Sequence, residues 1–329
     1  MKTDLPRRAT LLLGSVALLV VAAGASMAVG ARPVAVGEVW RALTDFAGTT
    51  DHHVVRDIRL PRTVLGVCVG TALGAAGMLI QTLTRNPLAE PGVLGVTAGA
   101  GFAINLGVLA GVTGSQAGQL GLAVAGAALA AIVVYAVGRV SPLRLVLAGV
   151  ALGWVLTGVS LGLRLTFPDV FDRYRFWSVG ALAGTEQTPL LLPVLVTVVA
   201  LVAALATTGP LNALALGEDV AHALGAHVTR VRLAVLVLVT VLTGVATAVA
   251  GPIAFVGLMV PHLARRLAVD SIPWGMAYSM LLGPLLLLVA DIGSRVLLPT
   301  GEVPVSIVTA FLGGPVLIWA VRRYGAGAR

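Results

Sequence analysis

The chain has 329 residues, of which 58% are hydrophobic and only 11% are charged, and its mean hydropathy is +0.99. Soluble domains carry about 25% charged residues, so the composition excludes an ordinary soluble protein and indicates an integral membrane protein. The net charge is +8, and the single cysteine, Cys68, excludes an intramolecular disulfide framework.

Apolar stretches of about 20 residues, the length that crosses a bilayer, recur along the chain. They predict spans near 10–31, 60–83, 92–110, 116–138, 143–166, 189–207, 231–250, 274–297 and 304–321. A further piece, 252–264, is too short to cross upright, and counting it gives ten membrane helices. Ser26-Met27-Ala28 also fits a signal-peptide cleavage site, but the apolar run before it is long for a signal core and favours a retained helix.

The distribution of charge predicts the orientation in the membrane. With the N-terminus inside and 252–264 returning, thirteen Lys and Arg and five Asp and Glu fall inside, which leaves nine arginines and nine acids outside. The excess of positive charge on one side follows the positive-inside rule. The basic character therefore reflects topology and does not indicate a nucleic-acid partner.

A nine-residue pattern occurs twice. Residues 86–94 read NPLAEPGVL and residues 251–259 read GPIAFVGLM, so both fit x-P-[LI]-A-x-x-G-[VL]-[LM] at an offset of 165. The predicted orientation places the first copy inside and the second outside. An offset of half the chain with inversion is typical of the inverted repeats of transporters.

Motifs for catalysis or metal binding do not occur in the sequence. It contains no H-E-x-x-H, no Cys/His cluster and no G-x-S-x-G, and its only lysine, Lys2, cannot supply a P-loop. The five histidines are scattered and favour structural roles. The chain is therefore predicted to be no enzyme and to hold no cofactor or metal, and any ATP hydrolysis must come from another chain.

A short polar segment at 216–225 interrupts the apolar pattern. Acids at its start and a glycine at its end favour a brief helix, and an apolar stripe runs along it at i, i+4 and i+8. The stripe residues are Leu216, Val220 and Leu224. Such an amphipathic helix on the inner face either lies on the bilayer or contacts a partner protein.

Seven stretches in chain order resemble the FecCD-type permeases of bacterial ABC importers, which import iron–siderophores, haem or vitamin B12. They are RLPR (59–62), QTLTRNPLAEPGVLGVTAGAG (81–101), LVLAGVAL (145–152), FWSVGAL (176–182), LNALALGEDVAHALG (211–225), GPIAFVGLMVPHLAR (251–265) and VPVSIVTAFLGGPVLIW (303–319). TLTRNPLAEPG and PDVFDRYRFW (168–177) look closest to ferric-enterobactin permease subunits.

The resemblance implies an all-α type II ABC importer permease fold with an inverted repeat, as one membrane-spanning domain over 1–329. The halves would be about 1–166 and 167–329. Residues 216–225 would be the coupling helix that docks on the ATPase, with its polar groups facing the ATPase and its stripe packed on the permease. The coupling residues would be Leu216, Gly217, Glu218, Asp219, Val220, His222, Leu224 and Gly225.

Further roles follow from the resemblance by position. Arg59 and Arg295 would dock glutamates of the binding protein, or alternatively extend to the membrane interface. The cytoplasmic gate would consist of Asn86, Leu88, Pro142 and Leu143. Some relatives carry small hydroxyl residues at the positions of Pro142 and Leu143. A structural motif would comprise Gly251, Pro252, Gly257, Pro261, His262 and Arg265, with Arg265 as an inside anchor.

The implied partners are a second permease subunit, identical or paralogous, two copies of an ATPase that bind ATP and Mg, and an extracytoplasmic siderophore-binding protein. The implied location is the bacterial inner membrane with both termini in the cytoplasm. The substrate would be a ferric siderophore, most consistent with a catecholate; haem and cobalamin are alternatives within the family. An ion-coupled secondary transporter is disfavoured because every Asp and Glu is expected in or near a loop or helix end rather than in mid-membrane.

Overall fold

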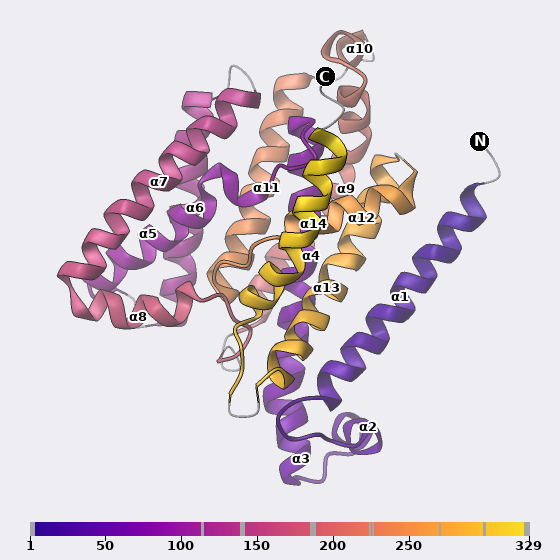
Figure 1. Cartoon of the computed structure of the whole chain (residues 1–329), viewed down its shortest axis with the longest axis vertical. Helices are drawn as coiled ribbons and strands as arrows, with labels where there is room; N and C mark the ends of the chain where they lie inside the picture. Colours follow the sequence, from indigo (N-terminus) through magenta and orange to yellow (C-terminus); the bar gives the residue numbers. More distant parts are fainter. Residues whose placement is uncertain are drawn as a thin grey trace.

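The computed structural model is all-helical in the part of the chain that it describes, apart from one isolated bridge between Leu298 and Gly301. The described residues are 4–112, 115–138, 142–184, 189–223, 225, 227–269, 271–298 and 301–325. Figure 1 shows long helices running roughly side by side, with short helices at both ends.

Ten helices account for the predicted membrane helices. They are α1 (Asp4–Ala28), α4 (Leu60–Thr84), α5 (Val96–Leu109), α6 (Gln116–Gly138), α7 (Pro142–Thr166), α9 (Leu191–Ala215), α11 (Val228–Ala250), α12 (Val256–Ala268), α13 (Ile272–Val296) and α14 (Val305–Gly325). Seven candidate spans are long and apolar enough to cross a bilayer, and α5 and α14 hold shorter apolar segments. Helix α12 has only 13 residues and carries two arginines in its last turn. The predicted all-helical membrane fold is confirmed.

Six short elements complete the described chain. They are α2 (Val36–Thr44), α3 (Thr50–His53), the π-helix η1 (Val54–Arg59), the 3₁₀-helix η2 (Pro91–Leu94), α8 (Pro168–Ser178) and α10 (Glu218–Ala223). In Figure 1, α10 and the start of α1 lie at one end of the molecule, whereas α2, α3 and α8 lie at the other. The end that carries α10 is the one that the charge distribution predicts to be inside.

Helix α4 forms the centre of the structure because its glycines allow close contact with other backbones. A Cβ added to Gly70 would lie 2.7 Å from the carbonyl oxygen of Gly283 in α13. A Cβ on Gly77 would lie 2.0 Å from the carbonyl oxygen of Gly257 in α12. Small residues at helix contacts are how membrane helices gain close packing, and here they fix α12 and α13 against α4.

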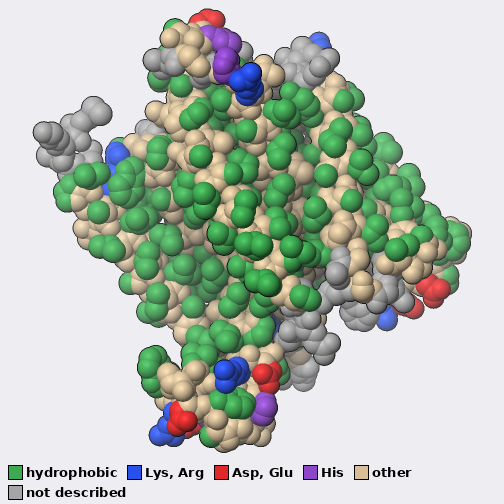
Figure 2. All heavy atoms as spheres, turned by 180° about the vertical axis from the view of Figure 1, so that it is seen from behind, with side chains coloured by type: hydrophobic (Ala, Val, Ile, Leu, Met, Phe, Trp, Pro, Cys, Tyr) green, Lys and Arg blue, Asp and Glu red, His purple; other side chains and the backbone are tan. Residues whose placement is uncertain are grey.

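Helix α1 is attached to this centre by polar contacts near both of its ends. The hydroxyl groups of Ser26 and Thr63 lie 2.9 Å apart, and the Tyr278 hydroxyl donates to the Arg8 carbonyl at 2.7 Å. Figure 2 shows apolar side chains covering the middle of the visible face, with the charged side chains gathered toward its two ends. This banding is what a bilayer-spanning surface requires.

Candidate functional site

The predicted coupling segment forms a turn, a short helix and a second turn that connect α9 to α11. Gly217 has a φ of 126° and Gly225 a φ of 79°, a backbone region that favours glycine. Between them lies the six-residue α10, whose Ala221 amide donates to the Gly217 carbonyl at 2.9 Å. The sequence therefore positions a compact polar helix at the tip of the molecule, where Asp219 and His222 are exposed.

The face of α10 that packs on the protein differs from the predicted one. Ala221 is fully buried, whereas Leu216 is 67% exposed and Val220 is 42% exposed. The expectation that the apolar stripe packs inward is therefore wrong for these two residues, because the small Ala221 side chain allows α10 to approach its neighbours more closely. Leu224 and the side chain of Glu218 lie outside the described residues.

The two halves of the predicted gate lie on neighbouring elements. Asn86 is exposed, and its Oδ1 accepts a hydrogen bond from the Leu88 amide at 2.9 Å, which closes a tight turn directly after α4. Pro142 and Leu143 begin α7, which packs against η2; their side chains lie outside the described part. The gate role itself stays a prediction.

The motif at 251–265 fixes the backbone between α11 and α12. Gly251 has a φ of 73°, and a Cβ there would lie 2.2 Å from the Trp177 carbonyl oxygen. The Pro252 carbonyl oxygen lies equally close to a Cβ built on Gly180. A Cβ on Gly257 would lie 2.7 Å from Cδ of Pro91. These contacts explain why glycine occupies positions 251 and 257.

The rest of the motif continues along α12, which contains Pro261. His262 is buried and meets the Trp319 ring edge to face, with 5.5 Å between ring centroids. Arg265 donates to Gln81 Oε1 at 2.8 Å, and Gln81 in turn donates to the carbonyls of Gly257 and Leu258 at 3.3 Å. Arg265 thus joins α12 to the C-terminal end of α4.

The two copies of the nine-residue pattern touch one another. The Oε1 atom of Glu90 accepts a hydrogen bond from the Phe255 amide at 2.9 Å, and these residues are 165 positions apart, which is the repeat offset. Phe255 has a φ of 69° and directly precedes α12. A carboxylate is favourable at a helix N-terminus, so the first copy supplies the acceptor for the start of the second half-length helix.

Comparisons with known proteins agree with this geometry. Residues 18–323 match the model of the FecCD transport family. The chain belongs to this family. It is 46% identical over 326 residues to the ferric enterobactin transport system permease protein FepD of Escherichia coli, with 97% of each chain covered. It is 36% identical to the probable siderophore transport system permease protein YfiZ of Bacillus subtilis, with 93% of each covered.

A solved structure extends the match to the fold. A metal-chelate type ABC transporter in an inward-facing conformation superimposes with a TM-score of 0.85 at 28% identity, covering 95% of this chain and 99% of that one. The resemblance predicted from the motifs is therefore confirmed. As a member of the FecCD family, the chain is a multi-pass permease subunit of an ABC transporter and not itself an enzyme.

The predicted docking arginine that precedes α4 in this FecCD permease points into the protein. Arg59 is 6% exposed and donates to the carbonyls of Met27 at 2.9 Å and Ala28 at 2.8 Å, and also to that of Arg32. Its role in docking a binding protein stays a prediction. In this structure the guanidinium binds the C-terminal end of α1 and the loop that follows it, so these hydrogen bonds would have to break before a binding protein could dock on Arg59.

Arg295 is enclosed in a buried cluster of charges that sequence reasoning missed. It is 4% exposed, donates to the Ser26 carbonyl at 2.7 Å and pairs with Asp291. The other oxygen of Asp291 accepts from Arg62 Nε at 3.0 Å and Nη2 at 2.8 Å, and Arg62 also pairs with Glu302 at 2.7 Å. The docking role of Arg295 also stays a prediction.

Asp291 is fully buried in α13, five residues before the end of the helix at Val296, so it lies near a helix end, as expected from the sequence, but it is enclosed by protein. Two arginines share its charge, which offsets the cost of burying it. The cluster joins α4 and α13, and the Arg295 contact with Ser26 extends it to α1.

Helix α8 carries the PDVFDRYRFW stretch at the end opposite α10. Arg164 of α7 lies over the Tyr174 ring, 4.3 Å from the ring centroid. Burial raises the pKa of the Tyr174 phenol, and the Arg164 charge partly offsets this. Asp169 and Asp172 are exposed on the same helix.

Among the described residues, no group of three or more His, Cys, Asp or Glu is placed to hold a metal ion.

Proposed function

We propose that this permease moves a ferric siderophore, of the catecholate type, from an extracytoplasmic binding protein into the cytoplasm. The observation that carries this proposal is the 46% identity to FepD, a ferric enterobactin permease, along 97% of both chains. YfiZ, a siderophore permease by name, is also similar over nearly the whole chain. Haem and cobalamin are the rival substrates within the family.

The proposed assembly contains a second permease subunit, two ATPase copies that bind ATP and Mg, and the binding protein. It lies in the bacterial inner membrane with both termini in the cytoplasm. Residues 216–225 dock on the ATPase, and their location at the tip of the inner end supports this role. The exposed Leu216, Asp219, Val220 and His222 offer both apolar and polar surface to the ATPase.

Deleting the gene tests the substrate. A strain that lacks it should fail to grow on a ferric catecholate siderophore as the only iron source, while its use of haem and cobalamin persists. Uptake of radiolabelled iron, with the wild-type gene restored on a plasmid as control, measures the defect. A deletion strain that loses cobalamin uptake and keeps siderophore uptake would show that the substrate is wrong.

Charge reversal at α10 tests the coupling role. The double substitution Glu218→Lys with Asp219→Lys removes two charges that favour a helix N-terminus, each worth about 0.3–1 kcal/mol, and changes the docking charge. Transport and stimulated ATP hydrolysis should both fall. The matched control is Asp169→Lys with Asp172→Lys, which makes the same charge change on α8 at the opposite end and should leave ATPase assembly intact. Equal loss of ATPase assembly in both variants would contradict the role of α10.

A further inference from the structure

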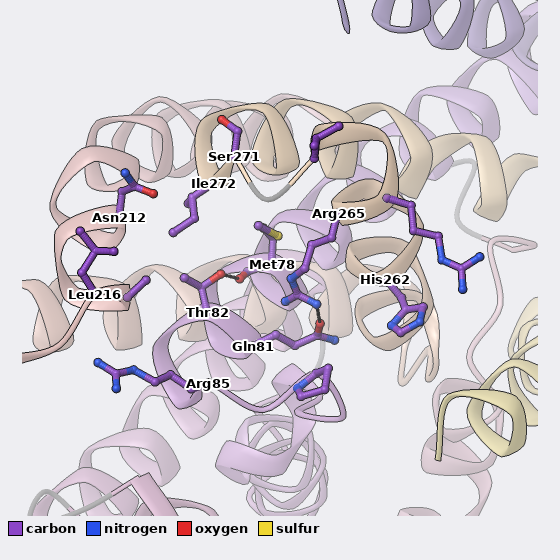
Figure 3. Close-up of a pocket in the computed structure, with 14 residues that line it drawn as sticks. Met78, Gln81, Thr82, Arg85, Asn212, Leu216, His262, Arg265, Ser271 and Ile272 are labelled. Atoms are coloured by element: carbon purple, nitrogen blue, oxygen red, sulfur yellow. Dashed lines mark hydrogen bonds between the residues drawn. The ribbon is translucent and has the colours of Figure 1, made fainter. Parts of the chain in front are cut away.

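A cavity of about 680 Å³ opens among four helix ends at the end of the molecule that carries α10. The ends are those of α4, α9 and α12 and the start of α13. Its wall includes Met78, Arg85, Leu216, Arg265, Ser271 and Ile272. Figure 3 shows these side chains surrounding a space above α4.

The depth of the cavity is set by the lengths of the helices that form it. Helices α4, α9 and α13 each have 25 residues, or about 37 Å at 1.5 Å per residue, whereas the hydrocarbon core is about 30 Å thick. Arg85 and Leu216 cap two of these helices, and Ser271 precedes the third. Helices of this length extend beyond the hydrocarbon core, so a cavity at their ends is at a level where phospholipid head groups would lie.

The charged side chains of the cavity are held in place from within the protein. Arg85 donates to the Leu214 carbonyl at 2.6 Å, which takes one of the five N–H donors of a guanidinium. Arg265 is oriented by its bond to Gln81, visible in Figure 3. Planar guanidinium groups suit phosphate oxygens, and the start of α13 adds the positive end of a helix dipole. The described lining contains no Asp or Glu.

The apolar side chains in the same wall distinguish a lipid from a soluble anion. Six of the lining residues are apolar, among them Met78, Leu216 and Ile272, and they would offer nothing to a free phosphate ion. A phospholipid presents a phosphodiester next to glycerol and acyl carbons, and so matches both parts of the wall. Basic pockets between membrane helices on the cytoplasmic side suit such head groups.

We propose that this cavity binds the phosphodiester head group of an anionic phospholipid, with Arg85 and Arg265 contacting the phosphate and Met78, Leu216 and Ile272 contacting the glycerol and acyl region. This proposal rests on the proposed function in one respect only, the choice of leaflet. The lipid belongs to the inner leaflet when α10 faces the cytoplasm. A lipid seated here contacts Leu216, the residue directly before the α10 turn.

Lipid retention by the purified full-length chain tests the proposal. The protein is equilibrated with equal parts of phosphatidylglycerol and phosphatidylcholine in detergent, and retained lipids are counted by native mass spectrometry. Arg85→Ala should reduce retained phosphatidylglycerol about tenfold, since a hydrogen bond to a charged group contributes about 1.5–3 kcal/mol. The matched control is Arg230→Ala, which removes an exposed arginine at the start of α11.

A second variant changes the cavity without changing its charge. Ala215→Phe should fill the space and also reduce retention of phosphatidylglycerol, with melting temperature showing that the fold persists. Equal retention in Arg85→Ala and Arg230→Ala would overturn the proposal. Displacement of the lipid by millimolar inorganic phosphate would overturn the lipid as the source of the phosphate, and displacement by the co-purified ATPase would identify the cavity as a protein-docking pocket instead. The gene deletion and the charge reversal at α10 do not depend on lipid retention, so they test the proposed function separately.

Discussion

Both copies of the nine-residue pattern lie where a long helix ends and a half-length helix begins, but their surroundings differ. Each follows a long helix and leads into a half-length one, since α5 has 14 residues and α12 has 13, or about 20 Å each. The first copy begins with the exposed residue Asn86. The second begins with Gly251, whose backbone is pressed against Trp177.

This difference shows how an inverted repeat acquires unequal halves. The second break is immobilised by backbone contacts, including the Ala181 amide that donates to the Ala250 carbonyl at 2.9 Å. The first break starts with a turn at the exposed Asn86, and its Pro91 packs on Gly257 beside the Phe255 amide that donates to Glu90. We infer that this exposed turn is the part of the repeat able to act as a gate.

The largest expected effect separates two equivalent glycines. A Cβ on Gly257 would lie 2.7 Å from Pro91, whereas its repeat mate Gly92 has only Thr97 Oγ1 nearby, at 3.5 Å. Gly257→Ala should therefore destabilise the protein by about 1–3 kcal/mol, the usual cost of overpacking, and Gly92→Ala should cost far less. Melting of the purified permease measures both. Equal melting temperatures would remove the asymmetry between the breaks.

An intermediate effect is expected at the contact between the copies. Glu90→Ala removes the acceptor of the partly buried Phe255 amide, and losing a typical intramolecular hydrogen bond costs about 0.5–1.5 kcal/mol. Glu90→Gln keeps an acceptor oxygen and should recover part of that stability. Chemical or thermal unfolding of the two variants provides the comparison. If both variants unfold like the wild type, the contact does not stabilise α12.

The smallest effect on stability is expected at the exposed turn. Asn86→Ala removes the bond to the Leu88 amide, and because the turn is exposed the loss should stay below about 1 kcal/mol. If this turn is part of the gate, siderophore uptake should change more than stability does. If Asn86→Ala has normal uptake but a melting temperature as low as that of Glu90→Ala, the turn stabilises the fold and is not part of the gate.

Much of this fold could be predicted from the sequence because each membrane-crossing helix corresponds to a long apolar stretch. The predicted spans match the ten helices to within a few residues at most ends, and the half-length α12 was recognisable from the short piece 252–264. The repeat was also visible, since 86–94 and 251–259 share their Pro, Ala and Gly positions. Motif order then identified the family.

Side-chain partners were less accessible because pairs distant in sequence leave no local pattern. Asp291 and Arg62 are 229 positions apart, and nothing near either residue predicts their contact. Glu90 and Phe255 are the exception, since the repeat offset of 165 relates them directly. The prediction that the stripe on 216–225 packs on the permease was wrong for Leu216 and Val220. Helical spacing shows which residues share a face, but not whether that face contacts the protein itself or a partner.

The proposed orientation places α10 in the cytoplasm and the α2–α3 end outside, and cysteine labelling tests it most directly. Single cysteines replace His222 in α10 and Thr50 at the start of α3 in a Cys68→Ala background. Intact cells are treated with a membrane-impermeant maleimide, and lysed cells serve as the control. With α10 in the cytoplasm, position 50 should react in intact cells and position 222 should react only after lysis. Labelling of position 222 in intact cells, with position 50 protected, would invert the orientation and contradict the coupling role of α10.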